Sequence, residues 1–418
     1  MAENNQYTNT KVQPKDFTSG WLIALIIGGT GLSLPTLYLG SEVALNLGLK
    51  NALIAFGIAT FVLTTMCIAT TLIGNRSRLS TYIILHFSFG ENGAKIVNSI
   101  FGITLIGWFS VALELLAVAI KDAAFEAFDV KITQWIIIII SSIFITITTV
   151  LGIKSLERLA NIAIPFLTVF LGYVVYKSIN QLDNFSQLFD YVPETSTMSL
   201  FDATSILVGS AILFPVLMAD FSRFIKNDKQ SLIAVLGIAI GFPLALTFSA
   251  IPSIQTGEID FIKIMNELNL VIPAFILLFI STWVTNATNL YSAVLTFSTI
   301  KKGWSFKKMT IICSVIGTLL ALFGFAEYLF DFLEFLGILA PSISAIYVIN
   351  FFWIKKQKYK LDEIVKWEFD ALLSWVISSI ITSFTYLEIF EITHAYFVDS
   401  FLLGGTIYLL LKMKRQSK

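Results

Sequence analysis

The sequence predicts an all-α integral membrane protein with twelve transmembrane helices. We expect a five-plus-five inverted repeat, in which the first and the sixth helix are broken, followed by two further C-terminal helices. Three observations lead to this prediction: the composition, the length of the apolar segments and the distribution of basic residues. The 418 residues are 56% hydrophobic and 13% charged, and the mean hydropathy is +0.80. A typical soluble domain carries about 25% charged residues, so the composition alone favours a membrane protein.

Twelve apolar segments cover most of the chain, and most of them approach the ~20 residues that a helix needs to cross ~30 Å of hydrocarbon. They are centred roughly on residues 20–39, 51–73, 96–120, 133–152, 159–176, 203–219, 231–250, 270–296, 309–326, 330–353, 369–387 and 394–411. Most connections between them are short, which leaves no room for a soluble catalytic domain.

The basic residues are concentrated in every second gap between these segments. Cytoplasmic loops of membrane proteins carry an excess of Lys and Arg. With the N-terminus in the cytoplasm, the Lys and Arg residues fall on the cytoplasmic side except Lys50, Lys121, Lys131, Lys177 and Lys263. Adding or removing one span would scramble this separation, so we expect both termini to be cytoplasmic. The short loops favour a bacterial plasma membrane.

The longest outer stretch is acidic and separates five spans from seven. We therefore expect a cytoplasmic tail at 1–19, a first repeat at 20–177, an extracellular linker at 178–202, a second repeat at 203–353, and two last spans with a cytoplasmic tail at 354–418. This division matches an established plan of inverted-repeat transporters. No internal similarity is visible by eye, so the symmetry is inferred from the number of spans.

Several function classes are disfavoured by what the chain contains. The formal net charge is zero, and the topology accounts for the basic loops, so nucleic acid is not expected as a partner. The two cysteines, Cys67 and Cys313, both lie inside apolar spans and indicate neither a disulfide framework nor a metal site. An enzyme would need a reactive motif, and a channel a repeated pore loop. We find neither of them in the sequence.

Small and helix-breaking residues cluster in the middle of the first span, where residues 28–35 read Gly-Gly-Thr-Gly-Leu-Ser-Leu-Pro. Gly costs a helix interior ~1 kcal/mol relative to Ala, and Pro costs ~3 kcal/mol. Gly209, Ser210 and Pro215 lie at the matching depth of the sixth span. Two interrupted spans in corresponding positions indicate a binding site. The alternative is close packing of helices through small residues.

Glu114 lies in the middle of the third span. A carboxylate at that depth costs at least ~2.5–3.5 kcal/mol unless it is paired or protonated. Glu114 is therefore a candidate proton carrier. The alternative is a structural carboxyl group that is hydrogen-bonded between helices.

Residues 219–224 read Ala-Asp-Phe-Ser-Arg-Phe. This stretch resembles the Ala-Asp-Phe/Tyr-x-Arg-Phe/Tyr signature of the nucleobase:cation symporter family, in its bacterial cytosine-permease branch. Three further stretches are similar to that family: Gly-Trp-Phe at 107–109, residues 283–293 in span eight, and residues 335–352 around Pro341. They occur in the expected order and spacing, and the resemblance covers nearly the whole chain.

The resemblance implies a secondary active transporter that imports a nucleobase or related heterocycle of the cytosine/purine class by cation symport, through alternating access. It implies that Trp108 stacks on the heterocycle, and that the amides of Asn286 and Asn289 recognise its edge. Asp220 and Arg223, at the cytoplasmic end of span six, are expected to have a structural or gating role. The other candidate substrate-binding residues are on the interrupted spans: Ser33, Ser210, Ala211 and Phe214.

Three positions depart from the family pattern. Ala211 replaces an aromatic residue that would cover the other face of the heterocycle, and Phe214 is a possible substitute. In span ten, Asn350 replaces an Asp. The sodium site of relatives uses two hydroxyls of span eight with carbonyls of the first span, but the pair here is Val284-Thr285. The candidate sodium ligands are therefore Gly29, Ser33, Ser281 and Thr285.

Two alternatives stay open at this point. A transporter with the same arrangement could carry an amino acid or another small amine, whose carboxylate would bind the backbone amides of span one. The coupling ion could be H⁺ rather than Na⁺, with Glu114 as its carrier. We expect no cofactor other than this ion, and a protein that functions as a monomer in the lipid bilayer. The sequence does not identify the base.

Overall fold

The computed structural model describes residues 11–151, 153–193, 198–300, 303–390, 392–393 and 395–416. Within this part of the chain the regular elements are helices, and one isolated bridge joins Thr18 to Ile225. The helices are α1 (Gly20–Gly31), α2 (Leu34–Ser77), α3 (Thr81–Phe128), α4 (Gln134–Leu151), α5 (Ile153–Asn180), α6 (Gln187–Asp190), α7 (Leu200–Ala211), α8 (Leu213–Leu217), α9 (Ala219–Ser222), α10 (Asp228–Leu236), α11 (Phe242–Thr256), α12 (Phe261–Glu267), α13 (Val271–Ile300), α14 (Phe306–Leu322), α15 (Leu329–Ile349), α16 (Phe369–Tyr386) and α17 (Tyr396–Gln416).

The all-helical fold is as the sequence predicts, and each of the twelve apolar segments falls largely on helix. Nine helical stretches of the described chain are long and apolar enough to cross a bilayer. Two of these, α2 and α3, are interrupted where Gly48 has φ 74° and Gly90 has φ 76°. Glycine adopts such positive φ values without the steric cost that a side chain would bring. The start of α2 therefore continues α1 across a break, and the rest of α2 is a separate span.

Three short helices lie outside the expected spans. Residues 81–89 form a helix before Gly90, and α6 and α12 lie in the loops after α5 and α11. The Asp220 carboxylate fixes the first of them, because the backbone N–H of Thr81 donates to Asp220 Oδ1 at 2.9 Å. In α12 the Asp260 side chain caps the first turn. Hydropathy did not reveal these helices because they are too short to be read as spans.

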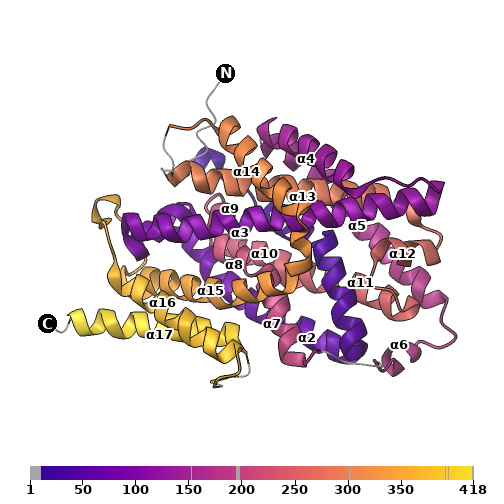
Figure 1. Cartoon of the computed structure of the whole chain (residues 1–418). Helices are drawn as coiled ribbons and strands as arrows, with labels where there is room; N and C mark the ends of the chain where they lie inside the picture. Colours follow the sequence, from indigo (N-terminus) through magenta and orange to yellow (C-terminus); the bar gives the residue numbers. More distant parts are fainter. Residues whose placement is uncertain are drawn as a thin grey trace.

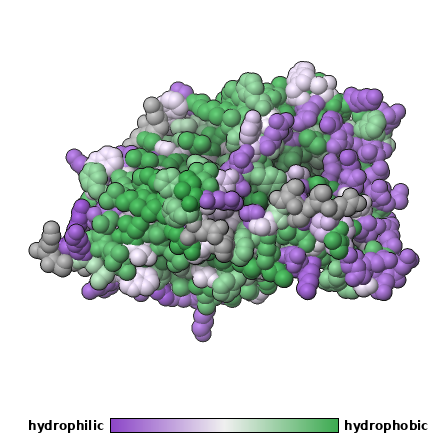
Figure 2. All heavy atoms as spheres, turned by 60° about the horizontal axis from the view of Figure 1, so that its bottom comes forward, coloured by the Kyte–Doolittle hydropathy of each residue, from purple (hydrophilic) through white to green (hydrophobic). Residues whose placement is uncertain are grey.

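The long helices pack side by side along one main direction, as Figure 1 shows for α3, α15, α16 and α17. The most extensive contacts join α3 to α13, α2 to α11, and α15 to α17. The surface is apolar over much of its area. Figure 2 shows green apolar atoms over the middle of one face and hydrophilic residues concentrated towards its right-hand end. Phe61, Ile103 and Val169 are among the large apolar side chains that the protein exposes, as expected for side chains that face lipid. The protein is a multi-pass integral membrane protein.

Several glycines of the interrupted spans lie in close helix contacts. A Cβ atom on Gly209 would lie 2.1 Å from the Leu333 carbonyl oxygen, and one on Gly241 would lie 2.6 Å from the Gly28 Cα. Both distances are far below van der Waals contact, so these positions require glycine. The close-packing interpretation of the small residues therefore holds for Gly28 and Gly209. It does not exclude a binding role for the backbone beside them.

Candidate functional site

The first span is broken between α1 and α2. Leu32 has φ −82° and ψ 57°, and Ser33 has φ −117° and ψ 158°, so the backbone leaves the helical region at both residues. Pro35 follows in the first turn of α2 and has no N–H to donate. The Leu32 N–H donates to the Gly29 carbonyl at 3.1 Å. The break leaves carbonyl groups of span one outside the regular backbone hydrogen bonding of a helix, as the sequence predicts.

Helix α13 meets this break directly. The Ser281 hydroxyl donates to the Leu32 carbonyl oxygen at 2.5 Å, which joins two residues 249 positions apart in the chain. Thr285 lies one helical turn after Ser281 on the same face. Its hydroxyl has no hydrogen-bond partner among the residues that the structure describes, whereas the Ser33 hydroxyl lies 3.4 Å from that of Thr36. Leu32 lies within the stretch from Gly29 to Ser33 whose carbonyls are expected to coordinate the ion. Its carbonyl is therefore a candidate ligand, because oxygen atoms are the donors that hard cations prefer.

Asn286 follows Thr285 in α13 and is completely buried, with 0% of its surface exposed. Neither its amide oxygen nor its amide nitrogen has a hydrogen-bond partner within the described chain. Buried side-chain amides in folded proteins are nearly always hydrogen-bonded, and an unpaired one needs an explanation such as a bound ligand. Asn289, the second predicted amide, is half-buried and likewise has no partner among the described residues.

Trp108 lies on α3, the helix that packs most extensively against α13. Its ring is half-buried and contacts Phe332 of α15 edge-on, with ring centroids 5.7 Å apart and planes at 70°. Phe332 in turn contacts Phe325 at 5.6 Å. The sequence interpretation missed Phe332 because no spacing rule connects α3 with α15. Ala211 is buried and Phe214 is half-buried in span six. The Ser210 hydroxyl donates to the Leu207 carbonyl at 2.8 Å, within its own helix.

Span six is interrupted, as the sequence predicts, but its interruption differs from that of span one. The hydrogen bonding of span six is interrupted between α7, α8 and α9, but Ile212 and Met218 keep right-handed helical dihedrals. The physical reason is that Pro215 has no backbone N–H and therefore removes one helical hydrogen bond, whereas no residue with an extended backbone follows it to separate the two parts of the span. The hydroxyl of Tyr347, on α15, donates to the Val216 carbonyl at 2.9 Å. This contact satisfies a carbonyl that the interruption frees, and sequence reasoning did not find it.

Glu114 is buried in the third span. Its Oε2 accepts a hydrogen bond from the backbone N–H of Ala326 at 2.9 Å, in the short helix η3 (Phe325–Tyr328) that precedes α15. This contact gives the carboxyl group a structural partner. Glu114 is thus hydrogen-bonded to the segment before α15, the kind of contact that the structural alternative expects.

Asp220 and Arg223 lie at the end of span six, where the chain turns into α10. Arg223 Nε donates to the Asp220 backbone carbonyl at 3.1 Å. Arg78, at the end of α2, donates to the Arg223 carbonyl at 3.1 Å, and its guanidinium lies 4.0 Å from the centroid of the Phe17 ring. The signature residues thus join the ends of three spans. The sequence interpretation missed Arg78, whose only signal was its place in a basic loop.

Comparisons with known proteins agree with this picture. A family described as "Permease for cytosine/purines, uracil, thiamine, allantoin" matches residues 13–401. The cytosine permease of Escherichia coli (strain K12) is 26% identical over 362 residues, which is 86% of this chain and 84% of that protein. The hydantoin permease of Microbacterium maritypicum is 24% identical over 305 residues, which is 66% of this chain and 61% of that protein.

The fold is similar to that of solved transporter structures. Mhp1, a nucleobase-cation-symport-1 family transporter, in a closed conformation with bromovinylhydantoin bound, superposes with a TM-score of 0.85 at 17% identity, over 97% of this chain and 94% of that one. Its inward-facing conformation superposes with a TM-score of 0.82, over 98% of this chain and 95% of that one. At this level of identity, the likeness concerns the fold.

Proposed function

The chain belongs to the family of permeases for cytosine/purines, uracil, thiamine and allantoin, and we propose that its site binds a nucleobase or a related planar heterocycle together with Na⁺. The protein is a membrane transporter, a nucleobase-type cation symporter, and not an enzyme. The proposal concerns which of its residues bind the substrate and the ion, and how the chain is arranged in the membrane.

The observation that carries the proposal is the unpaired, fully buried amide of Asn286. An amide offers both a donor and an acceptor, which the ring nitrogens and carbonyls of a nucleobase require. Burying such a group without a partner costs free energy, and a ligand that pairs with it would offset this cost. We assign Asn286 to the edge of the heterocycle, with Asn289 as a second polar contact.

The flat face of the heterocycle is assigned to Trp108. Base–aromatic stacking contributes ~1–3 kcal/mol per base in nucleic-acid complexes. Ala211 cannot stack on the opposite face, so an aromatic ring from elsewhere has to cover it. Phe214 on span six was the predicted substitute, and Phe332 on α15 is a second candidate because it already contacts Trp108. Ser33 and Ser210 complete the proposed set of substrate-binding residues.

The ion is assigned to the break in span one. The Gly29 and Leu32 carbonyls, with the hydroxyls of Ser281 and Thr285, would supply oxygen donors from α1 and α13. Unwound backbone of this kind coordinates Na⁺ in transporters with inverted repeats. An ion held there would tie span one to span eight, and so favour one packing of the two repeats over the other. In this assignment Ser281 replaces the hydroxyl that Val284 lacks. Ser33 takes part through its backbone.

We further propose the twelve-span arrangement with both termini in the cytoplasm of a bacterial cell. Spans one to five and six to ten form the inverted repeats, with the domain boundaries expected from the sequence, and α16 and α17 follow them. Substrate enters from outside and leaves to the cytoplasm as the repeats rock against each other. Asp220 and Arg223 hold the cytoplasmic ends of the spans together during this movement. A monomer contains the complete site.

The experiment is uptake into proteoliposomes of labelled cytosine, uracil, adenine, guanine, hypoxanthine, hydantoin and leucine, each under an imposed Na⁺ gradient and, separately, under a proton gradient. We expect uptake of a heterocycle that is driven by Na⁺, and its loss in Trp108→Ala. Uptake of leucine alone would overturn the proposed substrate. Uptake driven only by protons, and abolished in Glu114→Gln, would overturn the ion assignment and make Glu114 the carrier.

A further inference from the structure

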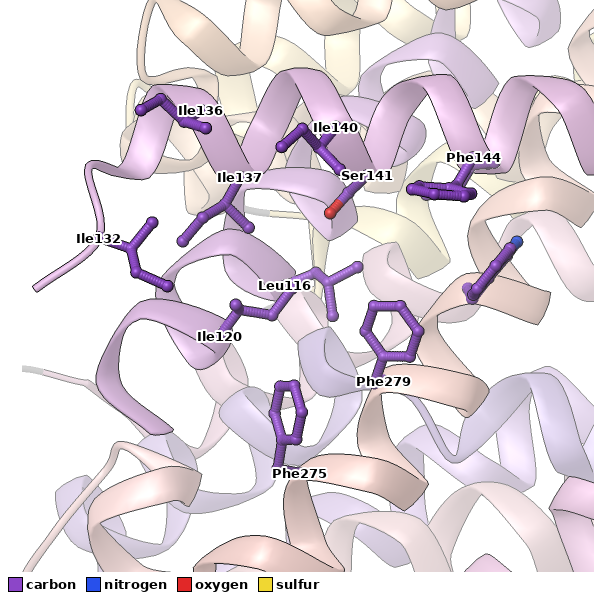
Figure 3. Close-up of a pocket in the computed structure, with 12 residues that line it drawn as sticks. Leu116, Ile120, Ile132, Ile136, Ile137, Ile140, Ser141, Phe144, Phe275 and Phe279 are labelled. Atoms are coloured by element: carbon purple, nitrogen blue, oxygen red, sulfur yellow. The ribbon is translucent and has the colours of Figure 1, made fainter. Parts of the chain in front are cut away.

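A cavity of about 320 Å³ lies outside the proposed site, between α3, α4 and α13 (Figure 3). Its volume is within the ~300–1,000 Å³ typical of small-molecule pockets. In Figure 3, side chains of α4 face those of α3, and two phenylalanines of α13 close the far side. The lining includes Leu116, Ile120, Ile132, Ile137, Ser141 and Phe279.

The cavity begins at one end of the three helices and extends towards their middle, where Phe144 and Trp283 line it. Leu116 and Ile120 belong to the last part of α3, Ile132 precedes the first residue of α4, and Phe279 is in the first third of α13. These ends are on the same side of the bundle, which is the outer side in the proposed topology. Apart from Ser141, the residues that line the cavity are apolar. A cavity with so few polar groups does not hold ordered water.

Some of the side chains that line the cavity are exposed on the outer face of α4. Ile140 and Phe144, which line the cavity, are 49% and 52% exposed on α4, and Ile143 on the same helix is also exposed. In a bilayer such side chains face hydrocarbon. A lipid acyl chain is the apolar molecule present at that place in high concentration, so it can enter the cavity from the side.

Charges at the mouth indicate what kind of lipid fits. Lys131 is adjacent to Ile132, and Asp129 is two residues before Lys131. Both side chains are exposed. Neither forms an ion pair with any described residue. Lys131 Nζ lies 5.9 Å from the centroid of the Phe125 ring, a contact that leaves its charge without an anionic partner. Of the other charges near this end, Lys121 lies 3.5 Å from Asp122, and Glu126 accepts a hydrogen bond from Asn266 at 2.6 Å. The mouth therefore offers one cation and one anion.

We propose that the cavity binds one phospholipid with a zwitterionic headgroup that ends in a primary amine, such as phosphatidylethanolamine. One acyl chain fills the cavity between α3, α4 and α13. The phosphate lies at Lys131 and the headgroup amine at Asp129. The bound chain fills the space behind the two helices that carry Trp108 and Asn286, and holds them in place.

The test is native mass spectrometry of the full-length protein, extracted from nanodiscs that contain equal amounts of phosphatidylethanolamine and phosphatidylglycerol with the same acyl chains. We expect one phosphatidylethanolamine to be retained in preference to phosphatidylglycerol. Ser141→Phe should fill the cavity and reduce retention at least about tenfold, because each buried methylene of the chain contributes to binding. Lys131→Gln should reduce it about fivefold, as expected for one charge near the membrane surface. Asp129→Asn should remove the preference for phosphatidylethanolamine over phosphatidylglycerol.

Lys50→Gln is the matched control, because Lys50 is an exposed lysine on the same side of the protein and far along the chain from the cavity. It should leave retention unchanged. Thermal melting of each variant shows whether it is folded, and Ser141→Leu replaces Ser141→Phe if the larger ring prevents folding. The proposal is wrong if the folded cavity-filling variant retains the lipid as the parent protein does. It is equally wrong if Lys50→Gln lowers retention as much as Lys131→Gln, or if phosphatidylglycerol binds as well as phosphatidylethanolamine.

Discussion

Asn286 in the middle of α13 and Asn350 at the end of α15 are both buried asparagines, with 0% and 2% of their surface exposed. Their surroundings differ. Asn350 donates to the Tyr408 hydroxyl at 2.8 Å and accepts from the Tyr359 hydroxyl at 3.1 Å. Asn286 has no partner within the described chain. An amide with partners stabilises the fold, whereas an amide without them is available to a ligand. The difference therefore distinguishes the proposed substrate-binding region around Asn286 from the region around Asn350, where the amide connects helices to each other.

The largest effect is expected for Asn286→Ala, measured as substrate uptake. The apparent affinity should fall by about 10- to 100-fold, which corresponds to the ~1–3 kcal/mol of a two-hydrogen-bond amide contact to a base. The melting temperature should stay the same or rise, because the substitution breaks no protein hydrogen bond. A variant that melts early, with uptake reduced only in proportion to the folded fraction, would show that Asn286 is structural.

The next largest effect concerns the ion. Thr285→Ala should raise the half-maximal Na⁺ concentration for uptake about tenfold. The ion would lose one oxygen ligand, which costs roughly as much as one hydrogen bond to a charged group. Ser281→Ala should have a similar effect and also release the Leu32 carbonyl. Thr288→Ala is the matched control, because its hydroxyl is bonded to the Val284 carbonyl within α13. An unchanged Na⁺ dependence in both Ser281→Ala and Thr285→Ala would place the ion elsewhere.

Asn350→Ala tests the other side of the comparison. It removes the amide from between Tyr408 and Tyr359 and breaks two hydrogen bonds between buried groups, which costs about 1–3 kcal/mol of stability. Thermal melting in detergent should show the loss, while the Na⁺ dependence and apparent affinity of the folded fraction stay unchanged. Asn350→Asp keeps the acceptor for Tyr359 and loses the donor to Tyr408. Its melting temperature should therefore differ from that of the parent protein and from that of Asn350→Ala. A change in substrate affinity would mean that span ten acts on the site through Asn350.

The smallest effect is a pH dependence in the loop between α15 and α16. Lys355 Nζ lies 2.8 Å from Glu363 Oε2, and this hydrogen bond and charge lower the pKa of the Glu363 carboxyl. Because the pKa of Glu363 is lower in the folded state, the ion pair stabilises the folded loop fully at pH values above the ordinary carboxyl pKa. This contribution is lost as the pH falls through the lowered value. Melting curves of Glu363→Gln and the parent should therefore converge in acid. Curves that stay equally far apart at every pH would contradict the pairing.

Much of the fold followed from local properties. All twelve apolar segments read from hydropathy fall largely on helices. This prediction succeeds because a helix that crosses a bilayer needs a continuous run of apolar residues, which is a local property of the sequence. The break in span one was also local, since the run from Gly28 to Pro35 contains its own helix breakers. Span six was predicted less well. Its Gly209 packs against Leu333, and its helix continues because no extended residue accompanies Pro215.

The sequence by itself determined that the chain is a helical membrane protein, where its first span breaks, and which motif connects it to a family of permeases. Only the tertiary structure decided which polar groups have partners. Glu114 bonds to Ala326, Ser281 to Leu32 and Tyr347 to Val216, and each pair joins residues more than 100 positions apart. Hydrogen-bond satisfaction is a property of packed helices rather than of local sequence. For this reason the free amide of Asn286 and the paired amide of Asn350 could be distinguished only in the folded chain.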